Sequence, residues 1–171
     1  MKTFASIGTF IDRLSTWSGK AVAWLCLILV LELVYDTIAR YGFNAPTEWS
    51  YDISYMLYGT MFMIGAAYTL LLDEHVRIGI LYDRVSARSK AIINIVGYLI
   101  FFFPVTLALL YYGTDYAVKS WKIMEHAGVS MWSPPIYPFK TVIPVAAFLL
   151  LLQGIVEFVR SLISVTKGGL L

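Results

Sequence analysis

Long apolar runs separated by short polar segments dominate the sequence. Four of these runs are long enough to cross a membrane as helices, because about 20 residues at 1.5 Å each span the roughly 30 Å of hydrocarbon in a bilayer. They cover approximately residues 19–39, 50–72, 91–112 and 142–163. The pattern predicts an all-α, polytopic membrane protein that forms a single four-helix domain over residues 1–171.

The segment before the first crossing, about residues 3–16, has an amphipathic pattern. Apolar residues recur every three or four positions from Phe4 to Leu14, with polar residues between them. This spacing is typical of a short helix that lies in the membrane interface. We expect the chain to turn into the membrane near Trp17 and Lys20.

Proline and aromatic residues predict further features of the third and fourth crossings. Pro104 follows three phenylalanines and predicts a kink near the middle of the third crossing. Apolar and charged residues from Tyr116 to Met124 predict an amphipathic segment along the outer surface. Residues 130–138 contain three prolines, which favour a stiff, extended outer loop.

The composition supports an integral membrane protein and gives its orientation. Hydrophobic residues make up 59% of the chain and charged residues only 14%, more apolar surface than one soluble core of this size could bury. If the N-terminus is cytoplasmic, nine of the 13 lysines and arginines lie on that side and four on the other. Because basic loops stay in the cytoplasm, we expect both termini inside. The small positive net charge is explained by this topology and requires no nucleic-acid partner.

Three charged residues in the first crossing are the first candidates for a functional site. Glu32, Asp36 and Arg40 are spaced four residues apart and therefore share one face of a helix. We expect an interfacial ion pair between Asp36 and Arg40. Glu32 lies deeper, where an ionisable group is costly unless it faces protein or water. It is either a proton or ion site or a contact to another helix or subunit, and we favour the contact.

The second crossing carries candidates at both ends and in its middle. Trp49 fits an aromatic belt, and Asp52 complements the positive end of the helix. Gly65 and Ala66 belong to a patch of small residues that lets another helix approach closely. The loop that follows contains further charged residues, of which we single out His75 and Arg77 as a cap on the negative end of the helix.

A charged surface follows the third crossing. Lys119, Lys122 and Glu125 lie on it, and they are either ordinary solvated residues or a docking face for an external protein. The single cysteine, Cys26, excludes a disulfide within the chain, and no Cys/His spacing suitable for zinc is present. We therefore expect no metal and no cofactor.

The order of several short motifs resembles one family. The motifs are Trp49-x-x-Asp52, Gly65-Ala66-Ala67, His75-Val76-Arg77-Ile78, a late Ser-Pro-Pro-Ile-Tyr-Pro stretch, Ile143-Pro144-Val145 and Leu152-Gln153. Together they resemble the small membrane subunit, DctQ-like, of tripartite ATP-independent periplasmic (TRAP) transporters. The chain departs from the family at Gly79, where an aspartate is common.

The resemblance implies a multi-pass protein of the bacterial inner membrane that is not an enzyme. In such systems a periplasmic binding protein captures an organic acid, such as a C4-dicarboxylate or sialic acid. A large, elevator-type membrane subunit moves the acid inward with sodium. The small subunit then scaffolds and anchors the large one among the membrane lipids and helps to dock the binding protein. The expected subunit interface comprises Glu32, Asp36, Arg40, Trp49, Asp52, Gly65 and Ala66.

The sequence leaves two other classes of protein as alternatives. A free-standing small proton-coupled transporter would use Glu32, as four-helix multidrug exporters use a membrane-embedded glutamate. The firm orientation given by the basic residues argues against it. A haem carrier or membrane enzyme is the second alternative. The only two histidines, His75 and His126, fall on opposite sides of the membrane, and no Ser/His/Asp set or phosphate-binding loop is present.

Overall fold

Four long helical rods run back and forth in the computed structural model, which describes residues 2–72, 87–128 and 130–166. Each rod is long and apolar enough to cross a membrane, which confirms the prediction of an all-helical chain with four candidate spans. In chain order the elements are α1 (Lys2–Gly42), α2 (Ser50–Leu71), α4 (Ala87–Gly97), η1 (Tyr98–Phe102), α5 (Phe103–Lys122), α6 (Tyr137–Lys140) and α7 (Val142–Thr166).

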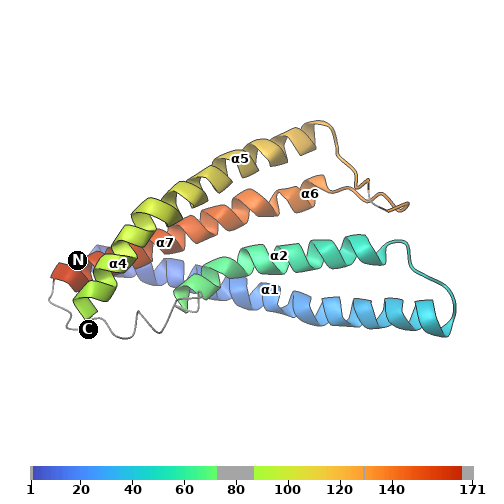
Figure 1. Cartoon of the computed structure of the whole chain (residues 1–171), viewed down its shortest axis with the longest axis horizontal. Coiled ribbons are helices and arrows are strands. Elements are labelled where there is room, and N and C mark those ends of the chain that lie inside the picture. Colours follow the sequence, from blue (N-terminus) through green and yellow to red (C-terminus); the bar gives the residue numbers. More distant parts are fainter. Residues whose placement is uncertain (1, 73–86, 129, 167–171) are drawn as a thin grey trace.

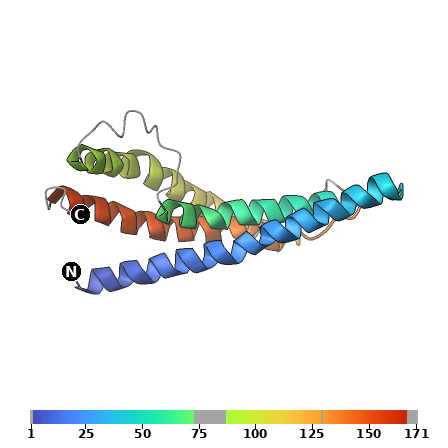
Figure 2. The same cartoon turned by 90° about the horizontal axis from the view of Figure 1, so that it is seen from below.

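The rods lie side by side in the order α1, α2, α7, α5 (Figure 1). Figure 2 shows that the N-terminal half of α1 lies at one edge of this array, away from α4. Helix α1 begins and α7 ends at the same end of the array, which we call the terminal end. The opposite end, here the turn end, holds the connections after α1 and α5. The turn between α1 and α2 projects past the end of α5 (Figure 1).

Glycines allow the rods to approach closely. A Cβ atom added at Gly154 of α7 would lie 2.1 Å from Cε1 of Phe102 in η1, and one at Gly19 of α1 would lie 2.5 Å from Cβ of Tyr68 in α2. At Gly113 of α5 it would lie 2.7 Å from a methyl group in α7. Small residues at contacts are how helices pack in a bilayer, where lipid is as apolar as the side chains.

The prediction of a separate interfacial helix followed by a turn is wrong. Helix α1 continues unbroken through Trp17 and Lys20 and contains 41 residues, about 60 Å at 1.5 Å per residue. Several polar side chains in this part of the chain bond within the helix or to α7: the hydroxyl of Thr16 donates to the carbonyl oxygen of Asp12 at 2.7 Å, and that of Ser15 donates to Gln153 at 2.8 Å. Polar residues with such partners require no break in the helix.

The irregularity expected near Pro104 is a π-helical turn. The π-helix η1 ends two residues before the proline, and the chain then continues as α5. Proline lacks an N–H and crowds the preceding turn, so a wider turn just before it accommodates both defects. Aromatic rings of Tyr98, Phe102 and Phe103 pack edge-on around this turn, together with Phe158 of α7.

The outer loop is folded back on itself, so the prediction of an extended loop is wrong. His126 and Pro135 form an antiparallel bridge, and the amide of Ala127 donates to the carbonyl oxygen of Pro134 at 2.8 Å. Positive φ angles at Met124 and Ser133 help to reverse the chain. The amphipathic segment expected before this loop is the continuation of α5, which runs to Lys122.

Candidate functional site

The acidic residues singled out in the sequence lie at the turn end, between helices. Glu32 of α1 is buried, with 8% of its surface exposed. The hydroxyl of Ser54 in α2 donates to its Oε2 at 2.6 Å, and the hydroxyl of Ser50 donates to its Oε1. Both carboxylate oxygens of Glu32 are therefore used in joining α1 to α2.

Asp36 lies one helical turn beyond Glu32 and makes a second connection. Its Oδ2 accepts a hydrogen bond from Arg40 at 3.0 Å, which confirms the expected ion pair. Its Oδ1 accepts from the hydroxyl of Thr47, just before α2. The carboxylate therefore joins the end of α1 to the start of α2, while the Arg40 side chain remains about half exposed.

Asp52 connects α2 to the outer loop. It is almost fully buried, with 1% of its surface exposed, and its Oδ2 accepts a hydrogen bond from the hydroxyl of Ser130. The neighbouring Trp49 stacks on Tyr35 of α1 with ring centroids 5.8 Å apart. The sequence placed Asp52 at a helix N-terminus, but its partner, 78 residues away, was not foreseen.

An ion pair fastens the other side of the same loop. Nζ of Lys140 lies 2.5 Å from Oε2 of Glu125 and 4.0 Å from the centroid of the Tyr116 ring. The Lys140 side chain is buried, and its hydrogen bond lowers the pKa of Glu125. Glu125 is therefore bound within the chain.

The two lysines expected beside Glu125 point elsewhere. Lys119 pairs with Asp115 one turn earlier at 2.6 Å, and both side chains are at least half exposed. Lys122 is exposed at the end of α5. The structure thus separates the expected docking group into a partly buried ion pair at Glu125 and exposed charge on α5.

A second polar cluster, at the terminal end, was missed as a unit. The completely buried Gln153 of α7 accepts a hydrogen bond from Ser15 at 2.8 Å and donates to Asp12 at 3.1 Å, both in α1. Arg160 lies 2.5 Å from both Asp12 and Glu157. Glu157 and Arg160 are one helical turn apart in the sequence, but nothing in the sequence indicates the partner helix.

The small-residue patch of α2 has two sides. Ala67 is fully buried within the array. A Cβ atom at Gly65 would have no neighbour within 4 Å, and Ala66 is partly exposed. Tyr58 and Phe62, two turns and one turn before Gly65 on the same face, are well exposed. This face of α2 is therefore open.

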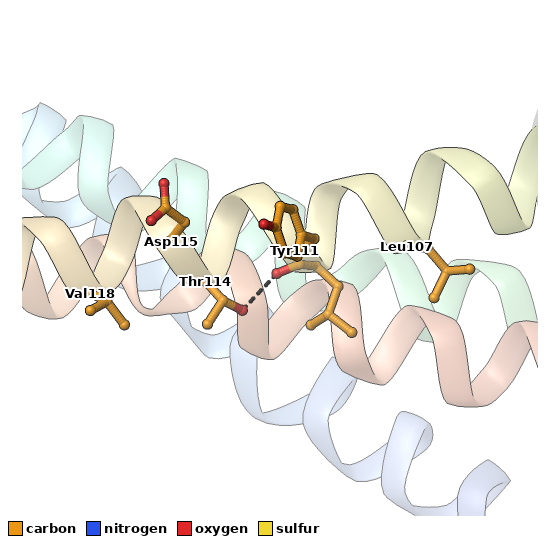
Figure 3. A pocket seen from close by; sticks show the side chains of 6 residues that line it. Leu107, Tyr111, Thr114, Asp115 and Val118 are labelled. Carbon is orange, nitrogen blue, oxygen red and sulfur yellow. Dashed lines mark hydrogen bonds between the residues drawn. The ribbon is translucent and has the colours of Figure 1, made fainter.

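The remaining candidates form no further site among the described residues. His75 and Arg77 lie outside the described residues. A depression of about 530 Å³ on α5 is lined by Leu107, Tyr111, Asp115 and their neighbours, all from that one helix (Figure 3). It is a groove on the surface of one helix and does not form a passage between helices. Among the described residues no group of three or more His, Cys, Asp or Glu side chains is placed to hold a metal ion.

These contacts describe a helix array held together by its own polar side chains. Glu32, Asp36, Asp52 and Gln153 each bind a side chain outside their own helix. None of these four has the free, convergent geometry of an acid or base waiting for a substrate. Their chemistry is that of connections between helices.

Comparison with known proteins identifies the family. Residues 29–163, more than half of the chain, match the model for "Tripartite ATP-independent periplasmic transporters, DctQ component". A comparison with curated proteins found no match. The matched region begins within α1 and ends within the last turn of α7. The chain therefore belongs to the DctQ family, the small, multi-pass inner-membrane components of TRAP transporters, and is a transport protein and not an enzyme.

Proposed function

We propose that this chain is a fixed support that holds the large membrane component of its transporter and takes no direct part in moving solute. The observation that carries the proposal is the use of its buried polar groups: Glu32 and Gln153 are bound by side chains of another helix, and Asp52 is bound by a side chain of the outer loop. A chain that moved solute itself would need polar groups that change partners between states.

The open face of α2 is the docking surface in this proposal. Tyr51, Tyr55, Tyr58, Phe62 and Gly65 follow one another at helical spacing and lie on this face. The hydroxyl of Tyr58 lies about 10 Å into the helix and has no hydrogen-bond partner among the described residues. A phenol at that depth favours a protein partner over lipid, because hydrocarbon offers it no hydrogen bond.

The other expected interface residues serve this surface indirectly. Glu32, Asp36 and Asp52 fix α2 against α1 and against the outer loop, so that the docking face has one shape. Arg40 and Trp49 lie beside it at the turn end. Ala66 and Gly65 let a helix of the large component approach closely.

The transport reaction follows from the family. We propose sodium-coupled uptake of an organic acid, such as a C4-dicarboxylate or sialic acid, delivered by a periplasmic binding component. The excess of basic residues, nine against four, supports a cytoplasmic position for both termini. The turn end then faces the periplasm. The binding component contacts this end, at Lys119, Lys122 and the loop that Glu125 holds in place.

A substitution at Gly65 tests the docking surface. Gly65→Leu adds a bulky side chain to the open face and is expected to weaken binding of the large component at least tenfold. Gly97→Leu is the matched control, because a Cβ there also meets nothing within 4 Å but lies on a different rod. The measurement is the affinity of each purified variant for the large component in detergent. Equal binding by all three proteins would contradict the proposed surface.

The alternative, a free-standing proton-coupled transporter, rests on Glu32. Its two bonds to serines of α2 favour a structural role instead. Reconstitution of the chain alone into liposomes separates the two functions. Proton-coupled flux without any other protein would support the alternative and overturn the supporting role.

A further inference from the structure

One exposed face of α1 changes its chemistry along the helix. From the terminal end, Phe10, Arg13, Trp17, Lys20 and Trp24 follow at alternating steps of three and four residues, all exposed. We call this set the aromatic–basic stripe. The same spacing continues beyond Trp24 with exposed residues that are purely aliphatic until the helix end approaches: Leu27, Leu31, Val34 and Ile38.

The stripe carries positive charge without a counter-charge from the chain. Neither Arg13 nor Lys20 has an ion-pair partner among the described residues. Asp12, the one acidic residue among the first 31, faces the other way and binds Arg160 and Gln153 of α7. Two cations thus point outward from a helix face on which aromatic rings alternate with them.

Each residue type in the stripe suits a membrane–water boundary. Tryptophan is enriched at the level of the headgroups, and arginine and lysine extend their charged ends toward phosphate while their stems lie along apolar surface. The change to aliphatic residues after Trp24 marks where the hydrocarbon begins. The exposed fraction of Trp17, 71%, shows that none of the described helices covers this face.

The geometry points to the aromatic–basic stripe as a binding surface for anionic phospholipid headgroups, at the membrane face where α1 begins. Arg13 and Lys20 are seven residues apart, about 10 Å along the axis, so they can hold two phosphates on one helix face. The headgroup region on each side of the bilayer is only about 5–7 Å thick. Both cations therefore lie within it when α1 is inclined to the membrane normal. The position of α1 at the edge of the array leaves this face open (Figure 2).

This inference does not depend on the supporting role, and lipid selectivity tests it. The full chain is reconstituted in bilayers of phosphatidylcholine with spin-labelled phosphatidylglycerol, and electron paramagnetic resonance gives the association constant of the labelled lipid relative to labelled phosphatidylcholine. Arg13→Gln with Lys20→Gln is expected to lower that constant about fivefold for each charge removed. The charge-preserving exchange Arg13→Lys with Lys20→Arg keeps the preference, which separates lipid binding from misfolding.

The matched control removes two charges from the other end of the array. Lys119→Gln with Lys122→Gln changes the net charge equally, and the preference is expected to stay within twofold of the wild type. Equal losses in both double variants, or no loss in either, would overturn the lipid site. A photo-crosslinker at position 17 that captures the large component in the assembled complex, instead of lipid, would also overturn it by showing a protein interface.

Discussion

Single glycines set the distances between the helices of this protein. Gly154 is the closest case, since a methyl group there would overlap the Phe102 ring. We expect Gly154→Ala to lower the free energy of unfolding by about 1–3 kcal/mol, the usual cost of overpacking. Gly97→Ala has open space and is expected to be neutral or to stabilise the helix by up to about 1 kcal/mol. Unfolding of both variants in mixed micelles checks this, and equal effects would contradict the packing.

The ion pair of Glu125 with Lys140 predicts a pH dependence. The folded-state pKa of the Glu125 carboxyl group is lowered below the ordinary value of 4.5, chiefly by the hydrogen bond from Lys140. The pair therefore contributes its full stability above about pH 4.5, and that contribution is lost as the pH falls through the lowered pKa.

The thermal midpoint measured at pH 7 and below pH 4 tests this dependence. The wild type is expected to lose more stability on acidification than Glu125→Gln, which lacks the titrating group. Glu48→Gln, at an exposed position, serves as the control and should follow the wild type. If the wild type and Glu125→Gln lose stability equally, the ion pair does not fasten the loop.

At the scale of elements, the length of α1 is the main departure from the sequence-based prediction. The amphipathic pattern before Trp17 is equally compatible with an interfacial helix and with a helix packed against α7. Only the partner on α7, Gln153, decides between them, and it lies 138 residues from Ser15. The sequence therefore predicted the helix but not its continuity.

Spin labels on α1 measure that continuity directly. In a Cys26→Ser background, labels at Ile7 and Val34, both exposed, are separated by 27 residues and should lie about 40 Å apart in one straight helix. Double electron–electron resonance gives the distance. A turn near Trp17 would bring the labels much closer.

The polar cluster at the terminal end predicts coupling between α1 and α7. Asp12→Asn and Arg160→Gln remove the two ends of one interhelical pair. A double-mutant cycle on the free energy of unfolding is expected to give about 0.5–3 kcal/mol of coupling. Asp115 and Lys119, an exposed pair within one helix, form the control cycle, for which we expect no more than about 0.5 kcal/mol. Equal coupling in the two cycles would mean that the cluster does not join the helices.

Local pairs were predictable where distant ones were not. The sequence predicted the Asp36–Arg40 pair, because helical spacing alone brings these side chains together. The Glu157–Arg160 pair is local in the same way. It could not predict that Asp52 binds Ser130, since that contact depends on how the outer loop folds back. The open face at Gly65 was expected as a docking patch, but the fully buried Ala67 shows that the same patch also packs inside the chain.

At the scale of the molecule, the four rods form an array (Figure 1), and many large apolar side chains are exposed on it. Polar contacts join α1 to both α2 and α7, and glycine contacts join α7 to the rod of η1 and α5. In the proposed supporting role, an array fastened in this way enlarges the fixed part of the transporter without needing to move. Its other faces would then be solvated by lipid, and the open face of α2 would contact the large component.

Uptake by the complete transporter with Glu32→Gln tests the central claim most directly. Glutamine can keep hydrogen bonds to Ser50 and Ser54 but cannot carry a proton or bind a cation as a carboxylate does. The organic acid bound by the cognate binding component is the substrate, and uptake is normalised to the amount of assembled complex. We expect uptake within about twofold of the wild type. Loss of uptake from a fully assembled complex would show that Glu32 takes part in transport and would contradict the supporting role.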